Sequence, residues 1–214
     1  MMIRLMIDDQ YAKMPWDKID TVIFDVGKVL LSFEPRKILE EQFPGQTELH
    51  EKLLMKMFHS PYWVMMDHGT VTTQEAEIAM AGLETELRPA IRHILDNWID
   101  LKDVIDEGVE ALHACKAHGK KLLVLSNYMS EPFAYACRKH SFFSLFDDLV
   151  VSSRVGMVKP DPAIYQYVTE RYQLDPTRTL FIDDNPANIE AALHHGWQGF
   201  CLNTPGKLHD FMAE

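Results

Sequence analysis

The sequence predicts an α/β protein built on a doubly wound parallel sheet, with a bundle of helices inserted after the first strand. Two patterns carry this prediction. From residue 105 onward, short apolar runs that indicate strands alternate with segments whose apolar residues recur at helical spacing. Between residues 32 and 104 only the helical spacing occurs, so this segment adds helices and no strand.

The first core strand is expected at Val22-Ile23-Phe24. These β-branched and aromatic side chains predict a strand buried on both faces, and Asp25 stands where it ends. Open α/β sheets bind ligands at the carboxyl ends of their strands, so Asp25 lies where chemistry is expected. Taken alone, an Asp just before Gly27 is more often a turn residue. A functional Asp25 therefore depends on motifs farther along the chain.

The inserted segment is expected to form roughly four helices, at 35–43, 47–58, 72–82 and 86–101. The third begins with Thr72-Thr73-Gln74-Glu75, which has the spacing of a capping box. We expect residues 32–104 to be one helical domain and residues 1–18 to be an N-terminal extension. The core then consists of residues 19–31 and 105–214.

The rest of the core follows in alternating order. A helix from Asp106, with Gly119 at its C-cap, precedes a strand that ends at Ser126. Asp161-Pro162 and Asn185-Pro186 each combine a capping residue with a proline, which is typical of helix starts. The remaining elements are expected at 131–140 (helix), 148–152 (strand), 162–172 (helix), 179–183 (strand), 186–195 (helix) and 199–202 (strand).

Composition excludes several classes of protein. The formal net charge of −11 argues against a nucleic-acid partner, because phosphate backbones are bound through clustered Lys and Arg. No apolar run is long enough to span a membrane. Asp8-Asp9 cuts short the apolar opening, which leaves no room for a signal peptide. Cys115, Cys137 and Cys201 match no disulfide or zinc spacing, so a reducing compartment, the cytoplasm, is expected.

Three later stretches resemble Asp25 in carrying polar groups near strand ends. Ser126-Asn127 and Asp183-Asp184 each follow an apolar run, and Lys159 lies in a loop before a helix. Turn chemistry and helix capping explain each stretch separately. Together they offer a carboxylate that can attack a phosphoryl group, hard oxygen ligands for Mg²⁺, and a cation for phosphate oxygens.

In this order, Phe-Asp-Val-Gly, Leu-Ser-Asn, Val-Lys-Pro and Phe-Ile-Asp-Asp-Asn resemble the four motifs of the haloacid dehalogenase-like superfamily, whose core is Rossmann-like. The resemblance covers residues 19–203. It implies that Asp25 is the nucleophile, and that Mg²⁺ is held by Asp25, the Gly27 backbone carbonyl and Asp184. Asp183 is then a partner of the metal's waters or of its ligands.

The resemblance also implies the phosphate contacts. Ser126 and Asn127 would hold phosphate oxygens through the hydroxyl and a backbone or amide N–H, and Lys159 would fix a phosphate oxygen or Asp25 itself. The insert resembles the helical cap of subfamily I, which folds over the site and selects the substrate. Candidate contacts from that cap are Trp63, Met65, Met66, Asp67 and His68. For Trp and Met, a place in the core of the insert is the commoner role.

One position departs from the family pattern. Many family phosphatases carry a second Asp, the general acid and base, two residues after the nucleophile, and here that residue is Gly27. Asp-x-Gly resembles the sugar-phosphate phosphatase branch. We therefore expect an Mg²⁺-dependent phosphatase acting on a small phosphorylated metabolite, such as a sugar phosphate. The alternatives are a 2-haloacid dehalogenase, against which Asp183-Asp184 speaks, and a non-catalytic binding module of the same fold.

Overall fold

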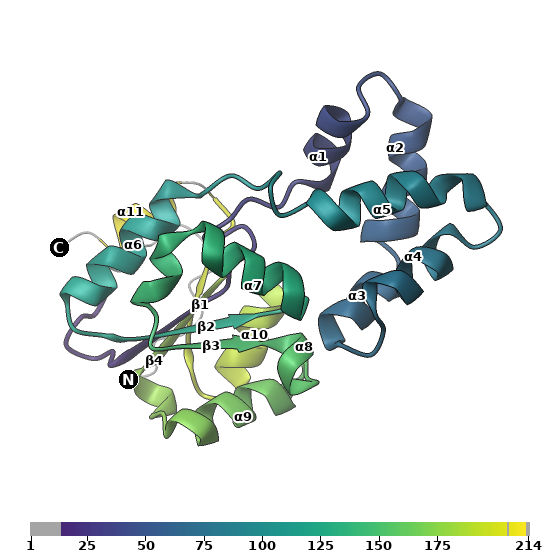
Figure 1. The fold of residues 1–214 in the computed structure, drawn as a ribbon. Coiled ribbons are helices and arrows are strands. Elements are labelled where there is room, and N and C mark those ends of the chain that lie inside the picture. The colour runs from purple at the N-terminus through teal and green to yellow at the C-terminus, as the bar shows by residue number, and fades with distance from the viewer. Residues whose placement is uncertain (1–13, 205, 213–214) are drawn as a thin grey trace.

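The computed structural model describes residues 14–204 and 206–212. Its centre is a sheet of five parallel strands in the order β3-β2-β1-β4-β5 (Figure 1). The prediction of an α/β fold with a parallel sheet is confirmed. The strands are β1 (Thr21–Phe24), β2 (Lys121–Ser126), β3 (Asp148–Val151), β4 (Thr179–Asp183) and β5 (Gln198–Cys201).

Strand β1 occupies the middle of the sheet. Phe24 pairs with Val124 of β2 on one side and with Ile182 of β4 on the other, and all residues of β1 are buried. After β1 the chain builds β2 and β3 on one side, and then crosses over to build β4 and β5 on the other. The point where this order reverses lies between β1 and β4, which is where open α/β sheets form their ligand crevice.

Helices cover both faces of the sheet because successive strand side chains point to opposite sides. Phe24 belongs to the apolar cluster that contains Phe133 of α7, whereas Ile23 belongs to the cluster that contains Ile164 of α9 and Ile189 of α10. The core helices are α6 (Asp106–Ala117), α7 (Ser130–Lys139), η3 (Ser141–Leu145), α8 (Ser152–Val155), α9 (Pro162–Tyr172), η4 (Pro176–Arg178), α10 (Pro186–His194) and α11 (Lys207–Met212).

The insert between β1 and β2 is entirely helical and stands to one side of the sheet (Figure 1). The capping box that opens α4 is present, because Thr72 Oγ1 accepts a hydrogen bond from the Glu75 N–H at 3.2 Å and the Glu75 carboxylate accepts one from the Thr72 N–H at 2.8 Å. The elements of the insert are α1 (Pro35–Gln42), α2 (Thr47–Leu53), the π-helix η1 (Leu54–Phe58), α3 (Pro61–His68), α4 (Thr73–Ala81), η2 (Thr85–Leu87) and α5 (Arg88–Asn97).

Two features of the insert differ from the sequence prediction. Helix α3 was not expected, because the run Trp63-Val64-Met65-Met66 is apolar without a clear period; packing buries Trp63 and Met66 and leaves Val64 56% exposed. The last helix ends at Asn97, several residues before the predicted end at 101. After Asn97 the chain forms a turn over residues 98–101, and residues 103–105 then pair with the segment that follows β1.

The two connections between insert and core run antiparallel to each other. Leu31 forms an isolated bridge with Val104, the Ser32 N–H donates to the Asp103 carbonyl at 2.8 Å, and the Ile105 N–H donates to the Leu30 carbonyl at 2.9 Å. Because these bonds tie both connections together, the insert is attached through a short two-stranded neck.

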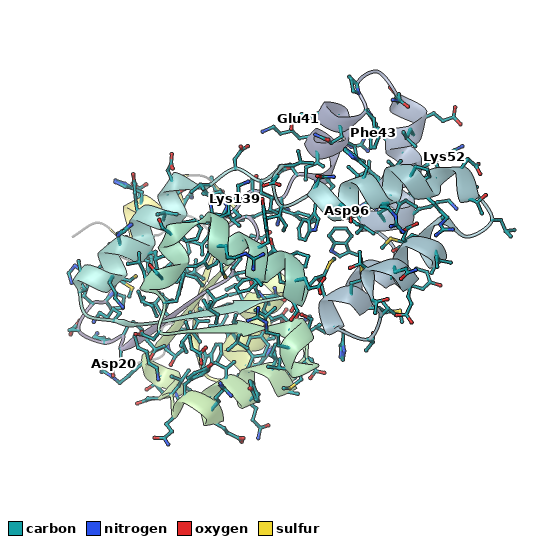
Figure 2. The ribbon with its side chains drawn as sticks, viewed as in Figure 1. Asp20, Glu41, Phe43, Lys52, Asp96 and Lys139 are labelled. Atoms are coloured by element: carbon teal, nitrogen blue, oxygen red, sulfur yellow. The ribbon has the colours of Figure 1, made fainter. Side chains whose placement is uncertain are left out.

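Charged side chains face outward from both parts of the molecule. Glu41, Lys52 and Asp96 are exposed on the insert, and Asp20 and Lys139 are exposed on the core (Figure 2). Of the expected N-terminal extension, residues 1–13 lie outside the described part. Within that part, no helix combines the length and the apolar character needed to cross a bilayer.

Candidate active site

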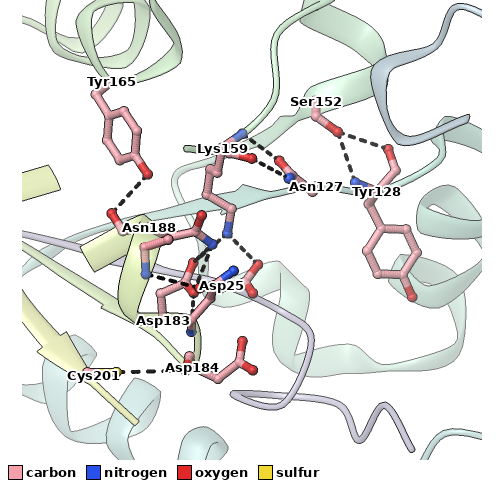
Figure 3. A network of polar contacts seen from close by, with 12 residues as sticks. Asp25, Asn127, Tyr128, Ser152, Lys159, Tyr165, Asp183, Asp184, Asn188 and Cys201 are labelled. Atoms are coloured by element: carbon pink, nitrogen blue, oxygen red, sulfur yellow. Dashed lines mark hydrogen bonds and ion pairs between the residues drawn. The ribbon is translucent and has the colours of Figure 1, made fainter. Parts of the chain in front are cut away.

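The carboxyl ends of three neighbouring strands bring the predicted polar residues together. Asp25 directly follows β1, Ser126 ends β2, and Asp183 ends β4 with Asp184 next to it. One carboxylate oxygen from each of Asp25, Asp183 and Asp184 lies within 4.8 Å of the others (Figure 3). Residues separated by more than 150 positions in the sequence thus meet at one edge of the sheet.

Lys159 joins two of these carboxylates. Its Nζ lies 2.9 Å from Asp25 Oδ1 and 2.7 Å from Asp183 Oδ2, and its side chain is almost completely buried (Figure 3). Burial alone would lower the pKa of the Lys159 ammonium, but the negative charges of Asp183 and Asp25 outweigh it and raise that pKa. Lys159 is therefore a fixed positive charge beside Asp25.

Asp183 is held by protein donors on every side. Besides Lys159, its Oδ1 accepts from the Asn185 N–H at 2.8 Å, and Asn188 Nδ2 lies 3.0 Å from each of its carboxylate oxygens. Asp184 is less tightly bound than Asp183. Its side chain is 26% exposed, and its Oδ2 lies 3.7 Å from Lys28 Nζ. Burial, together with the charges of Asp25 and Asp183, raises the pKa of Asp184 to about 6.

Asn127 is bound to the loop that carries Lys159. Asn127 Nδ2 donates to the Lys159 carbonyl oxygen at 2.9 Å, and Asn127 Oδ1 accepts from the Lys159 N–H at 2.8 Å. The sequence offered the side-chain amide or a backbone N–H as the phosphate contact. Since the amide is engaged with Lys159, the backbone is the part of Asn127 that is left to meet a ligand.

A pocket of about 440 Å³ lies over this site, and its walls come partly from the insert. Its floor is formed by Asp25, Ser126, Asn127, Lys159 and Asp184, whereas Asp183 is buried beneath it. Two of the candidate cap contacts, Trp63 and Asp67, line it. Met65, Met66 and His68 do not, and Met66 is buried within the insert. Asp67 is partly exposed to the pocket, and its burial in the surrounding protein raises its pKa to about 7.

The sequence analysis missed several residues of this pocket, three of which carry polar groups from the insert and the loop after β2. Lys102 and Trp98 come from the chain that leads from α5 back to the core, and Tyr128 follows Asn127. Lys102 is only 5% exposed, which is unusual for a lysine. The available signal was weak: Lys102 comes directly after a helix predicted to end at Leu101, where a single lysine usually faces solvent.

The acidic cluster fits a hard divalent cation. Three carboxylates within a few ångströms of one another repel, and the pKa of Asp184 is raised by burial first and then by the charges of Asp25 and Asp183. Mg²⁺ prefers carboxylate, carbonyl and water oxygens and needs only one or two carboxylates from the protein. Asp25, Asp184 and Gly27 all line the pocket, so two carboxylates and a backbone carbonyl could supply this donor set.

Comparison with known proteins identifies the family. A sequence model of the hydrolase family described as haloacid dehalogenase-like hydrolase matches residues 19–196. The chain belongs to the haloacid dehalogenase-like hydrolases. The resemblance proposed from the four motifs is thus confirmed at the level of the family, and the helical insert after β1 corresponds to the cap of its subfamily I.

Individual haloacid dehalogenase-like relatives are distant. The chain is 25% identical to the GMP/IMP nucleotidase YrfG of Escherichia coli (strain K12) over 90% of its own length and 86% of the nucleotidase. It is also 25% identical to the drimenol cyclase drtB of Aspergillus calidoustus over 81% of its length, although it spans only 32% of that longer protein.

Solved structures share the fold. An enzyme of this family from Bacteroides thetaiotaomicron, bt-2542, in complex with magnesium and inorganic phosphate, superposes with a TM-score of 0.66 at 20% identity, over 86% of this chain and 93% of that one. An L-2-haloacid dehalogenase from Xanthobacter autotrophicus, with chloropropionic acid covalently bound, gives a TM-score of 0.63 at 18% identity, over 85% and 76%. Both phosphate-binding and dehalogenating proteins thus have this architecture.

Proposed function

We propose that this protein is an Mg²⁺-dependent phosphatase that hydrolyses a small phosphorylated metabolite through an aspartyl phosphate on Asp25. The observation that carries the proposal is the joint position of Asp25, Asp184 and Lys159, two carboxylates and a buried ammonium at one edge of the sheet. A lone nucleophilic carboxylate would repel a phosphate dianion. Here fixed positive charge stands beside the attacking oxygen, which removes much of that repulsion.

In the proposed complex, Asp25, Asp184 and the Gly27 carbonyl hold Mg²⁺, and Asp183 orients Lys159. The metal would supply positive charge that neutralises the phosphoryl oxygens during transfer. Ser126 and the backbone of Asn127 hold two further phosphoryl oxygens, and the Lys159 ammonium holds another or keeps Asp25 in place. Residues 32–104 act as the cap over a core of 19–31 and 105–214, so that water is excluded while the substrate is bound.

The first chemical step is attack of an Asp25 carboxylate oxygen on phosphorus. A P–O bond to Asp25 forms, the P–O bond to the leaving group breaks, and the leaving oxygen departs with the electron pair. In the second step, water attacks the same phosphorus atom, releases inorganic phosphate and restores the Asp25 carboxylate. Neither step changes an oxidation state.

The site lacks a general acid at the position where many family members carry one. A carboxyl at position 27 would protonate the leaving oxygen and later activate water, and Gly27 has none. We therefore propose substrates whose leaving groups are stable as anions, such as anomeric sugar phosphates, acyl phosphates and aryl phosphates. A named nucleotidase among the relatives supports a phosphorylated metabolite as the substrate class.

The second candidate function is 2-haloacid dehalogenation, which the covalent complex of the Xanthobacter enzyme brings into view. In that reaction Asp25 would attack carbon instead of phosphorus, and no metal is needed. The acidic cluster disfavours it, because Asp184 beside Asp25 has no role in a metal-free reaction and would repel a haloacid carboxylate.

Hydrolysis of p-nitrophenyl phosphate with and without Mg²⁺ tests the proposal. We expect release of p-nitrophenol only with Mg²⁺ and none from the Asp25→Asn variant, whereas 2-chloropropionate should release no chloride. Chloride release without metal would support the dehalogenase instead. If neither substrate nor a panel of phosphorylated metabolites is turned over, the protein is a binding module and the proposal fails.

A further inference from the structure

Lys102 has the most unusual environment of the pocket-lining lysines. It lies near the C-terminal end of the insert, and its Nζ faces three aromatic rings, at 4.4 Å from the ring centroid of Trp98, 4.7 Å from that of Phe33 and 5.0 Å from that of Tyr128. Phe33 lies at the start of the insert, and Tyr128 belongs to the loop after β2. The ammonium therefore sits where both connections and the core meet.

This ammonium has no polar partner. Among the residues that the structure describes, Lys102 Nζ makes neither an ion pair nor a hydrogen bond. The indole N–H of Trp98 and the hydroxyl of Tyr128 are buried without a hydrogen-bond partner. Both residues are 3% exposed, and both line the same pocket as Lys102.

Three unpartnered donors at one place are costly to the fold. A buried N–H or O–H group without an acceptor loses its hydration and gains nothing in return, and a buried ammonium loses more. Ring faces recover only part of that loss through cation–π attraction. Burial lowers the pKa of Lys102 to about 7, while Asp25 and Asp67 favour its charged form. An acceptor-rich group that enters the pocket would satisfy all three donors at once.

We propose that Lys102, the Trp98 indole N–H and the Tyr128 hydroxyl form a second anion-binding subsite, which receives a carboxylate or a second phosphate on the leaving-group part of the substrate. The inference rests on the proposed phosphatase function, because Asp25 and Lys159 then hold the reacting phosphoryl group on the floor of the same pocket. The preferred substrates are phosphomonoesters that carry another negative charge, not neutral sugar or alkyl phosphates.

Asp67 is the acidic group that also faces this subsite. It interacts with Lys102 electrostatically but lies too far away for an ion pair among the described residues. Since burial raises the pKa of Asp67 to about 7, an arriving anion meets a carboxyl that is easily protonated and then becomes a fourth donor. Asp67→Asn should therefore keep the preference for anionic substrates.

Two substrate pairs test the subsite, each pair differing in one anionic group. The first pair is 3-phosphoglycerate and glycerol 3-phosphate; the second is glucose 1,6-bisphosphate and glucose 1-phosphate. We expect kcat/KM to be at least about tenfold higher for the anionic member of one or both pairs, as charge-assisted hydrogen bonds imply. The pair that shows the preference identifies the second group as a carboxylate or as a phosphate.

Lys102→Met and Lys102→Gln should abolish this preference. In these variants, kcat/KM for the substrate with the second anionic group should fall to the value for the substrate that lacks it. The same change should lower kcat/KM for p-nitrophenyl phosphate far less. Tyr128→Phe, which removes only the hydroxyl, should reduce the preference in part. Lys121→Met is the matched control: Lys121 also lies over a ring, 5.2 Å from the centroid of Tyr172, but at the opposite end of β2. It should behave like the wild type.

A wild type without preference in either pair would overturn the subsite, and so would an equal loss on both members in the Lys102 variants. Loss on every alkyl phosphate with aryl phosphate spared would make Lys102 a proton donor, and would also overturn it. Calorimetric binding of phosphonoacetate and 2-hydroxyethylphosphonate in Mg²⁺ separates this inference from the proposed function. Tighter phosphonoacetate binding that requires Lys102 supports the subsite even if no phosphate ester is hydrolysed, and equal binding contradicts it even if one is.

Discussion

The side-chain amide of Asn127 forms two hydrogen bonds with the backbone of Lys159: Nδ2 donates to the carbonyl oxygen at 2.9 Å, and Oδ1 accepts from the N–H at 2.8 Å. The two residues come from different loops, one after β2 and the other before α9. This paired contact sets where the Lys159 side chain starts, and the ion pairs with Asp25 and Asp183 set where it ends. Asn127 is therefore a positioning residue for the cation beside the nucleophile.

Asn127→Ala should lower kcat by at least about tenfold, because the Lys159 ammonium loses its fixed place at the phosphoryl group. The Mg²⁺ concentration for half-maximal activity should change by less than about threefold, since Asn127 contacts no metal ligand. Steady-state kinetics with a Mg²⁺ titration measures both quantities. A variant with a lower melting temperature and wild-type kcat would assign Asn127 a purely structural role.

Asp184→Asn should raise the Mg²⁺ concentration needed for half-maximal activity by at least about tenfold, because an amide oxygen carries no charge. Its melting temperature without metal should stay the same or rise, since Asp184 is a half-buried carboxylate beside two others. Melting curves and Mg²⁺ titrations of the variant and the wild type provide the check. Unchanged titrations would leave Asp184 as a helix-start residue only.

Gly27→Asp should improve turnover of alkyl phosphates. A Cβ at Gly27 would meet no atom within 4 Å, so a side chain can start there without a clash. General acids contribute roughly 10²–10⁴-fold, and we expect at least about a tenfold gain. In the wild type, rates across aryl phosphates should depend steeply on leaving-group pKa, and in Gly27→Asp less steeply. Gly27→Ala is the control, and a flat wild-type dependence with chemistry rate-limiting would mean that another group donates the proton.

Lys102→Met should stabilise the protein, most strongly near neutral pH. Burial lowers the pKa of Lys102 from 10.5 to about 7, against the opposing charges of Asp25 and Asp67. As pH falls from 10.5 to 7, the unfolded chain takes up a proton that the folded state refuses, so wild-type stability falls. The variant lacks this loss, and its advantage in urea unfolding should grow from pH 10 to pH 7. An advantage that is constant with pH would contradict the burial of an unpaired ammonium.

The sheet and the floor of the site follow from local sequence, because a buried strand and the residue that ends it are neighbours in the chain. Asp25, Ser126 and Asp183 each stand at the end of an apolar run, and parallel strands bring such ends to one edge. Together with Lys159 they gave the four-motif resemblance, which the family match over residues 19–196 confirms. The insert was also recognisable as helical from its period.

The walls of the pocket could not be predicted in the same way. Lys102, Trp98 and Tyr128 meet only because the neck brings both connections against the loop after β2, and no spacing along the chain encodes that contact. Helix α3 was missed because its apolar residues show no helical period in the sequence. Only the folded structure shows that Trp63 and Met66 are the buried ones. The engagement of the Asn127 amide with Lys159 depends likewise on how two distant loops pack.

Rapid-quench mass spectrometry of the Asp25 peptide, with enzyme in excess over p-nitrophenyl phosphate and Mg²⁺ present, tests the central claim most directly. We predict a phosphoryl group on Asp25 that forms as p-nitrophenol is released and then decays as inorganic phosphate appears. Because position 27 carries no acid, the decay should be slow and the intermediate easier to detect. Release of p-nitrophenol and phosphate with Asp25 unmodified throughout, or with the phosphoryl group on another residue, would contradict the mechanism.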